Sequence, residues 1–394
     1  MQKSAVPIVT WHPHSAQRAN GWQSTLIALV RGLAALAVAA AHLRALFYPG
    51  MRTIPDPTLW FKGFAFFTGF GHQAVLLFFI VSGWLVGGSL LDKWRQPDAI
   101  ANYAVDRITR LWTVMIPLFA LTLLLAFLNG QLAGGAIDYS PKNDLSAAAL
   151  LGNLLGLQDI LVHTFGDNFA LWSLSNETWY YILFPLLIVL FTTQSLVTRT
   201  ACALTITAIA LFVSSTLLLF FSVWLLGAAG SRIAIHCGRM ARLSIALVLL
   251  AASAYCRIKG YTDDLSPASF GYDLVLSILF LVLLCSLQDA GAPSRWLTIK
   301  LDRAGRFFAE FSFTLYVIHI PLIYTFNHWS KELWGRDQLS PANSMHFIYY
   351  LVMLGLILAS AYVFYVLFEA HTHKIRRWAK RKIVRPRAAP AVPA

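Results

Sequence analysis

The sequence STLIALVRGLAALAVAAAHL, residues 24–43, indicates the class of this protein more clearly than any other stretch. At 1.5 Å per residue, a helix of this length covers about 30 Å, which matches the hydrocarbon core of a bilayer. Small residues dominate the run from Gly32 to Ala41, and such residues allow a neighbouring helix to approach closely. The stretch therefore predicts a membrane-spanning helix whose only ionisable residues are Arg31 and His42.

Similar apolar runs recur along the whole chain. Hydrophobic residues make up 58% of the 394 residues and charged residues only 12%, against roughly a quarter in soluble domains. We predict an all-α fold, a polytopic integral membrane bundle of about ten transmembrane helices. The expected spans are 24–43, 73–91, 111–129, 178–194, 200–214, 216–231, 243–256, 271–287, 309–327 and 346–369. Three of these, 200–214, 216–231 and 243–256, are short for a full crossing.

Basic residues set the expected orientation and the domain limits. With the N-terminus in the cytoplasm, 22 of the 31 Lys and Arg residues fall in cytoplasmic segments and eight in outer loops, as the positive-inside rule requires. We expect a cytoplasmic segment over 1–23, a transmembrane domain over 24–370 and a basic cytoplasmic tail over 371–394. The net charge of +13 is then explained by attraction to anionic lipid in the bilayer and not by binding of nucleic acid.

Arg31 and His42 lie at membrane depth, where an ionisable group costs several kcal/mol of free energy unless it is paired or hydrated. Their separation of eleven residues is three helical turns plus about 20°, so they share one face, roughly 16 Å apart along the axis. This placement favours a functional pair. Both residues also have a structural alternative. Arg31 could reach the membrane interface if the helix is tilted, and His42 could be an interfacial histidine without a function.

Three further residues have both a catalytic and a structural interpretation. His319 lies in an apolar span, and Tyr316 lies three residues before it on the same face. Pro321 frees a backbone carbonyl nearby, and His319 could simply bond a carbonyl inside the bundle. Glu177 opens the fourth expected span, where the helix dipole alone would favour an acid.

Other patterns have a structural explanation or indicate an anion site. Ser82, Gly83, Gly87 and Gly88 in the second span suit close helix packing. Two arginines, at positions 107 and 110, are three positions apart on a short cytoplasmic stretch, so both can face one phosphate, although positive-inside bias also places arginines there. The four cysteines contain no Cys-x-x-Cys pair, so we expect neither disulfides nor a metal site.

Taken together, these segments resemble membrane acyltransferase family 3, whose members transfer acyl groups to extracytoplasmic glycans and similar acceptors. The motifs appear in family order over roughly residues 25 to 370. They are Arg31-x10-His42, VLLFFIVSG from Val75, Arg107-Ile-Thr-Arg110, LWSLSNETWY from Leu171 and FTLYVIHIP from Phe313. One departure is near the end, where the family often has Glu-x-Pro and this chain has Glu369, Ala370 and His371.

The resemblance implies an O-acyltransferase in the bacterial inner membrane with both termini in the cytoplasm. It implies acetyl-CoA or another acyl-CoA as donor and a hydroxyl of a glycan or polysaccharide as acceptor. Arg31 and His42 carry over as the essential pair, and Arg107 and Arg110 as the donor-binding pair. Some relatives carry a fused hydrolase-like domain; we expect none here, and therefore direct transfer to the acceptor or passage of the acyl group to separate glycan-assembly proteins.

The resemblance leads to a mechanism with one open question. His42 would act as general base on the acceptor or accept the acyl group, and Arg31 would stabilise the thioester oxygen or orient the donor. The donor enters from inside while His42 lies near the outer boundary, so either a deep cavity or His319 as an intermediate station must connect them. A transporter, and a non-catalytic subunit of a polysaccharide assembly complex, are the rival classes.

Overall fold

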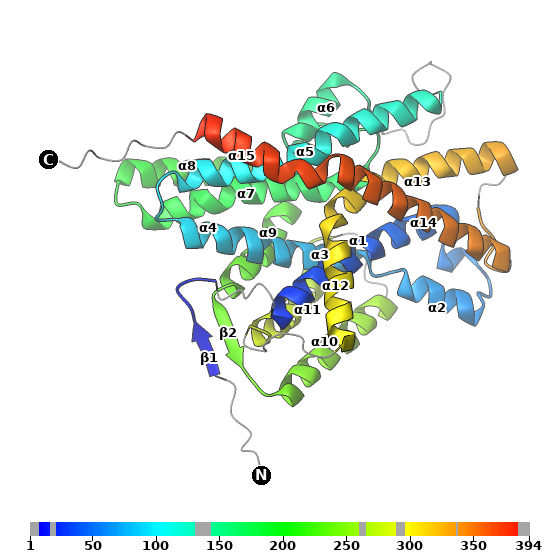
Figure 1. The fold of residues 1–394 in the computed structure, drawn as a ribbon, viewed down its shortest axis with the longest axis horizontal. Coiled ribbons are helices and arrows are strands. Elements are labelled where there is room, and N and C mark those ends of the chain that lie inside the picture. Colours follow the sequence, from blue (N-terminus) through cyan, green and yellow to red (C-terminus); the bar gives the residue numbers. More distant parts are fainter. Residues whose placement is uncertain are drawn as a thin grey trace, which may run out of the picture.

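The computed structural model describes residues 8–15, 21–130, 143–259, 265–288, 296–335 and 338–384. Almost all regular structure within these ranges is helical (Figure 1). In chain order the elements are β1 (Ile8–Trp11), α1 (Trp22–Phe47), η1 (Met51–Thr53), α2 (Leu59–Phe67), α3 (Gly71–Ser82), η2 (Gly83–Gly87), α4 (Gly88–Lys93), α5 (Ala99–Leu128), α6 (Ala147–Leu154), η4 (Phe169–Leu171), α7 (Trp172–Thr192), α8 (Leu196–Phe212), α9 (Ser215–Gly230), β2 (Ile233–His236), α10 (Arg239–Lys259), α11 (Phe270–Ser286), α12 (Trp296–Glu310), α13 (Ser312–Trp334), α14 (Ser344–Leu367), η5 (Glu369–His371) and α15 (Thr372–Ile383).

Six helices of the described chain are long and apolar enough to cross a membrane. A seventh crossing is formed if the bent pair Thr298–Glu310 and Ser312–Glu332 counts as one span. Three shorter apolar helices, α8, α9 and α11, would complete a set of ten. The predicted helical fold with apolar helices of membrane-spanning length is therefore confirmed, and the count of ten stays a prediction because it depends on these short helices.

A small antiparallel sheet departs from the all-α prediction. β1 pairs with β2 from Ile8 opposite His236 to Trp11 opposite Ile233, and Figure 1 shows the two strands side by side. Each strand has four residues, too few to give a periodic signal in the sequence. Their pairing also joins segments that are far apart in the chain.

Two glycines explain how the central helices pack so closely. A Cβ atom added at Gly32 would lie 2.6 Å from the Cβ of Phe308, so α1 and α12 cross almost in backbone contact. A Cβ at Gly83 would overlap the carbonyl oxygen of Trp224 on α9. Gly83 also begins the π-helical turn η2. The packing role predicted for the glycines of the second span is therefore confirmed at Gly83.

Helix boundaries differ from the predicted spans at three functionally relevant places. α5 begins at Ala99, so Arg107 and Arg110 lie within a long helix and not on a short connecting stretch. α7 begins at Trp172, so Glu177 lies in its second turn, and the interpretation as a helix N-terminal acid is wrong. The expected span 309–327 is interrupted at Phe311, where α12 and α13 meet at 55°.

Candidate functional site

Three cavities lie in a row through the helical bundle. We name them by one lining residue each: the Arg306 cavity, of about 620 Å³, the Arg107 cavity, of about 340 Å³, and the His42 cavity, of about 330 Å³. The first two share four lining residues, Arg31, Leu85, Arg110 and Arg376. The second and third share Val75 and Tyr316. These shared walls connect an arginine-rich end of the row to a histidine-lined end.

The Arg107 cavity is strongly cationic. Arginines from three helices line it: Arg31 from α1, Arg107 and Arg110 from α5, and Arg376 from α15. Glu177 is the acidic residue in the same wall. The rest of the lining is mainly apolar, so the charges act in a medium where they attract an anion more strongly than in water.

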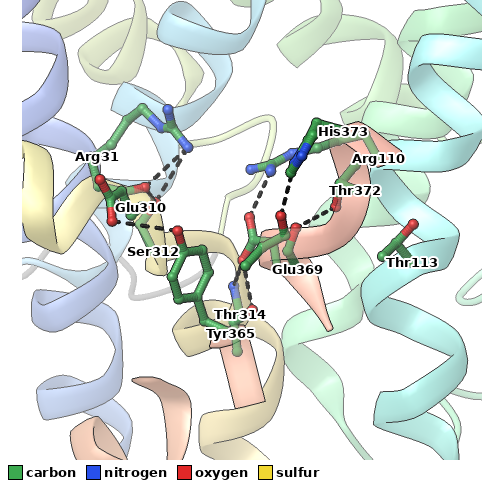
Figure 2. A network of polar contacts seen from close by, with 12 residues as sticks. Arg31, Arg110, Thr113, Glu310, Ser312, Thr314, Tyr365, Glu369, Thr372 and His373 are labelled. Atoms are coloured by element: carbon green, nitrogen blue, oxygen red, sulfur yellow. Dashed lines mark hydrogen bonds and ion pairs between the residues drawn. The ribbon is translucent and has the colours of Figure 1, made fainter. Parts of the chain in front are cut away.

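Arg31 is held at the break between α12 and α13. Its Nη2 donates to the Ala309 carbonyl at 3.3 Å and lies 3.5 Å from Ser312 Oγ (Figure 2). A helix end leaves backbone carbonyls without intrahelical partners, and the break at Phe311 creates such an end. Arg31 therefore stabilises the break and at the same time lines two cavities. The structural and functional interpretations of this residue both have support.

Arg110 is fixed by a buried carboxylate. Its Nη1 lies 2.6 Å from Glu369 Oε1, and its guanidinium lies over the Phe313 ring, 4.9 Å from the centroid. The other oxygen of Glu369 accepts from the backbone N–H and the hydroxyl of Thr314, at 3.2 and 2.6 Å, in the first turn of α13. Figure 2 shows Arg31 and Arg110 pointing toward one another across the site. Glu369 thus ties together α5, the start of α13 and the turn after α14.

Sequence reasoning missed the importance of Glu369. It entered only as a departure from the Glu-x-Pro pattern, yet its side chain is buried, at 4% exposure. A carboxylate is rarely buried without a partner. A single acid directly after an apolar span and before a basic tail was the available signal, because an acid at the end of a span needs a partner if it is buried.

Arg107 has a different environment. Its guanidinium lies over the rings of Tyr103 and Tyr181, at 5.9 and 5.7 Å from the centroids. Its Nε atom is buried without a hydrogen-bond partner among the described residues. Arg107 and Arg110 line one cavity, as their spacing predicts, but Arg107 is the arginine with unused hydrogen-bonding capacity.

Glu177 is part of a hydrogen-bonded chain with Ser82. The Ser82 hydroxyl donates to Glu177 Oε1 at 2.5 Å and accepts from the indole N–H of Trp224 at 3.2 Å. Ser82 is the last residue of α3, immediately before the π-helical turn. These hydrogen bonds hold the Glu177 carboxylate in one orientation in the wall of the Arg107 cavity.

His42 and His319 form a hydrogen-bonded pair, although 277 residues separate them in the sequence. The distance from His42 Nδ1 to His319 Nε2 is 2.8 Å. His319 is fully buried, and its Nδ1 lies 3.2 Å from the Leu315 carbonyl oxygen. The bond to a carbonyl, which was the structural alternative for His319, is therefore present, and the hydrogen bond to His42 is an additional contact that the sequence did not predict.

The direction of these bonds assigns the tautomers. A carbonyl oxygen can only accept, so neutral His319 carries its proton on Nδ1 and its lone pair on Nε2. That lone pair accepts from Nδ1–H of His42. The other nitrogen of His42, Nε2, then carries a lone pair, which is the state that a general base requires. The geometry therefore supports His42 as base and His319 as the group that orients it.

Tyr316 does not use its hydroxyl on His319. The hydroxyl donates to the Ala170 carbonyl at 3.1 Å and lies 2.7 Å from Ser173 Oγ, while the ring centroids of Tyr316 and His319 are 6.0 Å apart. The prediction that Tyr316 and His319 share a helix face is confirmed, but it did not reveal that the Tyr316 hydroxyl bonds to Ala170 and Ser173. Tyr316 lies at the wall between the Arg107 and His42 cavities.

Pro321 has the local effect expected from its chemistry. It removes the N–H that would bond the Val317 carbonyl, and the Asn168 side chain donates to that carbonyl at 2.8 Å. Asn168 precedes η4, whose Phe169 ring lies edge-on to His42 at 4.9 Å. The loop that covers His42 is thus attached to the helix that carries His319.

The His42 cavity combines polar groups with aromatic rings. His72 lies in its wall and pairs with buried Asp273 at 2.6 Å. The polar and aromatic lining further includes Gln158, Asp159, Phe169, Trp172, Ser175, Asn176 and Thr216. Hydroxyl-rich ligands suit such a lining, because it offers many hydrogen-bonding partners beside flat apolar surfaces.

The structure groups the sequence-predicted site residues differently from the sequence. Arg31, Arg107, Arg110 and Glu177 line the Arg107 cavity, while His42 lines the next cavity with Tyr316 between them. The hydrogen-bond partner of His42 is His319, and Arg31 is anchored elsewhere. Arg31 and His42 are therefore not paired as expected but line different, neighbouring cavities.

A protein-family model described as an acyltransferase domain matches residues 26–366. No curated protein and no solved structure gave a match.

Proposed function

Because the chain belongs to this acyltransferase family and is therefore an acyltransferase, we propose that it moves an acyl group from cytoplasmic acyl-CoA to a hydroxyl of an extracytoplasmic glycan. The observation that carries the proposal is the row of three cavities, which leads from clustered arginines to the His42–His319 pair. Neighbouring cavities that share walls in this way support the first of the two routes expected from the sequence, a deep cavity that leads from the donor side to His42. His319 then has no need to serve as a separate station, because it already contacts His42.

The donor enters through the Arg306 cavity. Its lining includes Arg306 and Arg376, from segments expected in the cytoplasm, together with Arg31 and Arg110. Phosphate groups of CoA favour clustered guanidinium groups, which form charge-assisted and often bidentate hydrogen bonds. Arg107, with its unused Nε, is the principal donor contact deeper in the row, and Arg110 acts from the position that Glu369 gives it.

The acceptor enters through the His42 cavity, which is lined by residues from segments expected on the outer side. A hydroxyl of the glycan gives its proton to His42 Nε2, and its oxygen attacks the thioester carbonyl. The new C–O bond forms, the C–S bond breaks, and the CoA thiolate leaves and takes the proton from His42 Nε2, which returns the imidazole to its neutral state. His319 stabilises the His42 ring in the required tautomer.

The test is reconstitution of the purified chain in proteoliposomes with labelled acetyl-CoA on one side and glycan on the other. Label should appear on the glycan with the wild type and not with His42→Ala at equal protein level. Mass spectrometry of cell-surface glycans with and without the protein would identify the modified position. Movement of glycan across the bilayer without any covalent label would favour the transporter class instead.

A further inference from the structure

Only two residues line both the Arg107 cavity and the His42 cavity among the residues described: Val75 of α3 and Tyr316 of α13. We call the place where they adjoin the junction. Val75 is 7% exposed. A β-branched side chain in a helix has one strongly preferred rotamer, so Val75 has little freedom to move aside.

Tyr316 is equally constrained. Its hydroxyl is attached to Ala170 and Ser173, and its ring packs edge-on against Phe78 with centroids 5.7 Å apart. The Ala170 carbonyl belongs to η4, which Asn168 attaches back to α13 through the Val317 carbonyl. A swing of Tyr316 would therefore break several hydrogen bonds at once, so this wall is preorganised.

The chemistry of acyl transfer directs two groups toward these walls. In the tetrahedral intermediate the reacting carbon carries the CoA sulfur, the acceptor oxygen, the former carbonyl oxygen and the alkyl group. The proposed function puts the sulfur on the side of the Arg107 cavity and the acceptor oxygen on the side of the His42 cavity. The alkyl group and the former carbonyl oxygen then point sideways from this line, toward the walls that Val75 and Tyr316 form.

We propose that Val75 and Tyr316 restrict the transferred acyl group to a short chain, with acetyl as the preferred one. This inference depends on the proposed function, because it assumes that the thioester and the acceptor meet at the junction. Discrimination of one methylene in an apolar pocket typically reaches about tenfold or more in kcat/KM.

The test compares acetyl-, propionyl- and butyryl-CoA as donors for the reconstituted wild type, Val75→Ala and Val75→Ile. Val75→Ala should raise the butyryl-to-acetyl ratio of kcat/KM about tenfold or more. Val75→Ile should lower the propionyl-to-acetyl ratio. The change should arise mainly in kcat, since the constraint acts on the tetrahedral intermediate and not on binding of the CoA moiety.

Val86→Ala is the matched control. Val86 is also 7% exposed and lines the Arg107 cavity, but it does not line the His42 cavity. It should leave the ratio of donors unchanged. Equal shifts in Val75→Ala and Val86→Ala, or an unchanged ratio in both Val75 variants, would overturn the inference while acyl transfer itself remains. Absence of transfer from every donor by the wild type would instead reject the proposed function and this inference with it.

Discussion

Substitution of His319 separates the orientation of His42 from proton transfer by His319 itself. A positioned general base contributes about 10²–10⁴-fold to a rate, so His42→Ala should lower kcat by that factor. His319→Ala removes the acceptor of the 2.8 Å bond from His42 Nδ1, and the loss of one hydrogen bond typically costs about 0.5–1.5 kcal/mol. We expect a fall in kcat of about 10²–10³, because the ring is no longer held in the reactive tautomer.

His319→Gln is the decisive variant. The Gln amide group extends to approximately the position of Nε2, and its oxygen can accept from His42 Nδ1–H but cannot take a proton near neutral pH. If His319 only orients His42, this variant should retain activity within about tenfold of the wild type. The double variant His42→Ala with His319→Ala should be scarcely worse than either single one, because residues that act as a unit lose activity non-additively.

The assay is transfer of labelled acetyl groups to glycan in proteoliposomes, with protein amount and monodispersity matched between variants. Two results would refute the reasoning. A His319→Gln protein as inactive as His319→Ala would show that His319 must itself exchange a proton. Near-normal activity of a well-expressed His42→Gln protein would exclude His42 as the base.

Three further predictions concern topology, donor binding and packing. In a cysteine-free background, a cysteine at Ala148 should react with an impermeant reagent added outside sealed cells and a cysteine at Arg303 should not; labelling at position 303 would invert the proposed orientation. Arg107→Ala should raise the KM for acyl-CoA about tenfold to a hundredfold, since a hydrogen bond to a charged group contributes about 1.5–3 kcal/mol, and Arg107→Lys should restore only part of it; an unchanged KM would remove Arg107 from the donor site. Gly83→Ala should lower the thermal midpoint in detergent because the added Cβ meets backbone, with a cost of about 1–3 kcal/mol, whereas Gly63→Ala, where nothing lies within 4 Å, should not; equal midpoints would contradict the close-packing argument.

The sequence by itself determined the class of the protein and much of the inventory of its site. Apolar runs of span length predict membrane helices because lipid tolerates little else, and the described helices agree with most of the expected positions. The three-residue spacing of Arg107 and Arg110 predicts that both can face one phosphate; both line one cavity, and their role in donor binding stays a prediction. The ordered motifs correctly indicated the acyltransferase family.

Helix boundaries and the small sheet were beyond local reasoning. The break at Phe311 and the early starts of α5 and α7 depend on partners outside each segment, such as Arg31 at the Ala309 carbonyl. The β1–β2 pairing has the same origin. Periodicity records which residues share a face, and it contains no information on what that face meets.

Only the tertiary structure decided which site residues act together. His42 pairs with His319 across 277 residues and Arg110 with Glu369 across 259, whereas Arg31, on the same helix as His42, lines different cavities. The reason is physical: one helix face can serve several cavities, and the choice among them is made by neighbouring helices. Close contacts at Gly32 and Gly83 bring those neighbours near enough to divide the interior into a row of cavities, with a histidine pair at one end and arginines at the other.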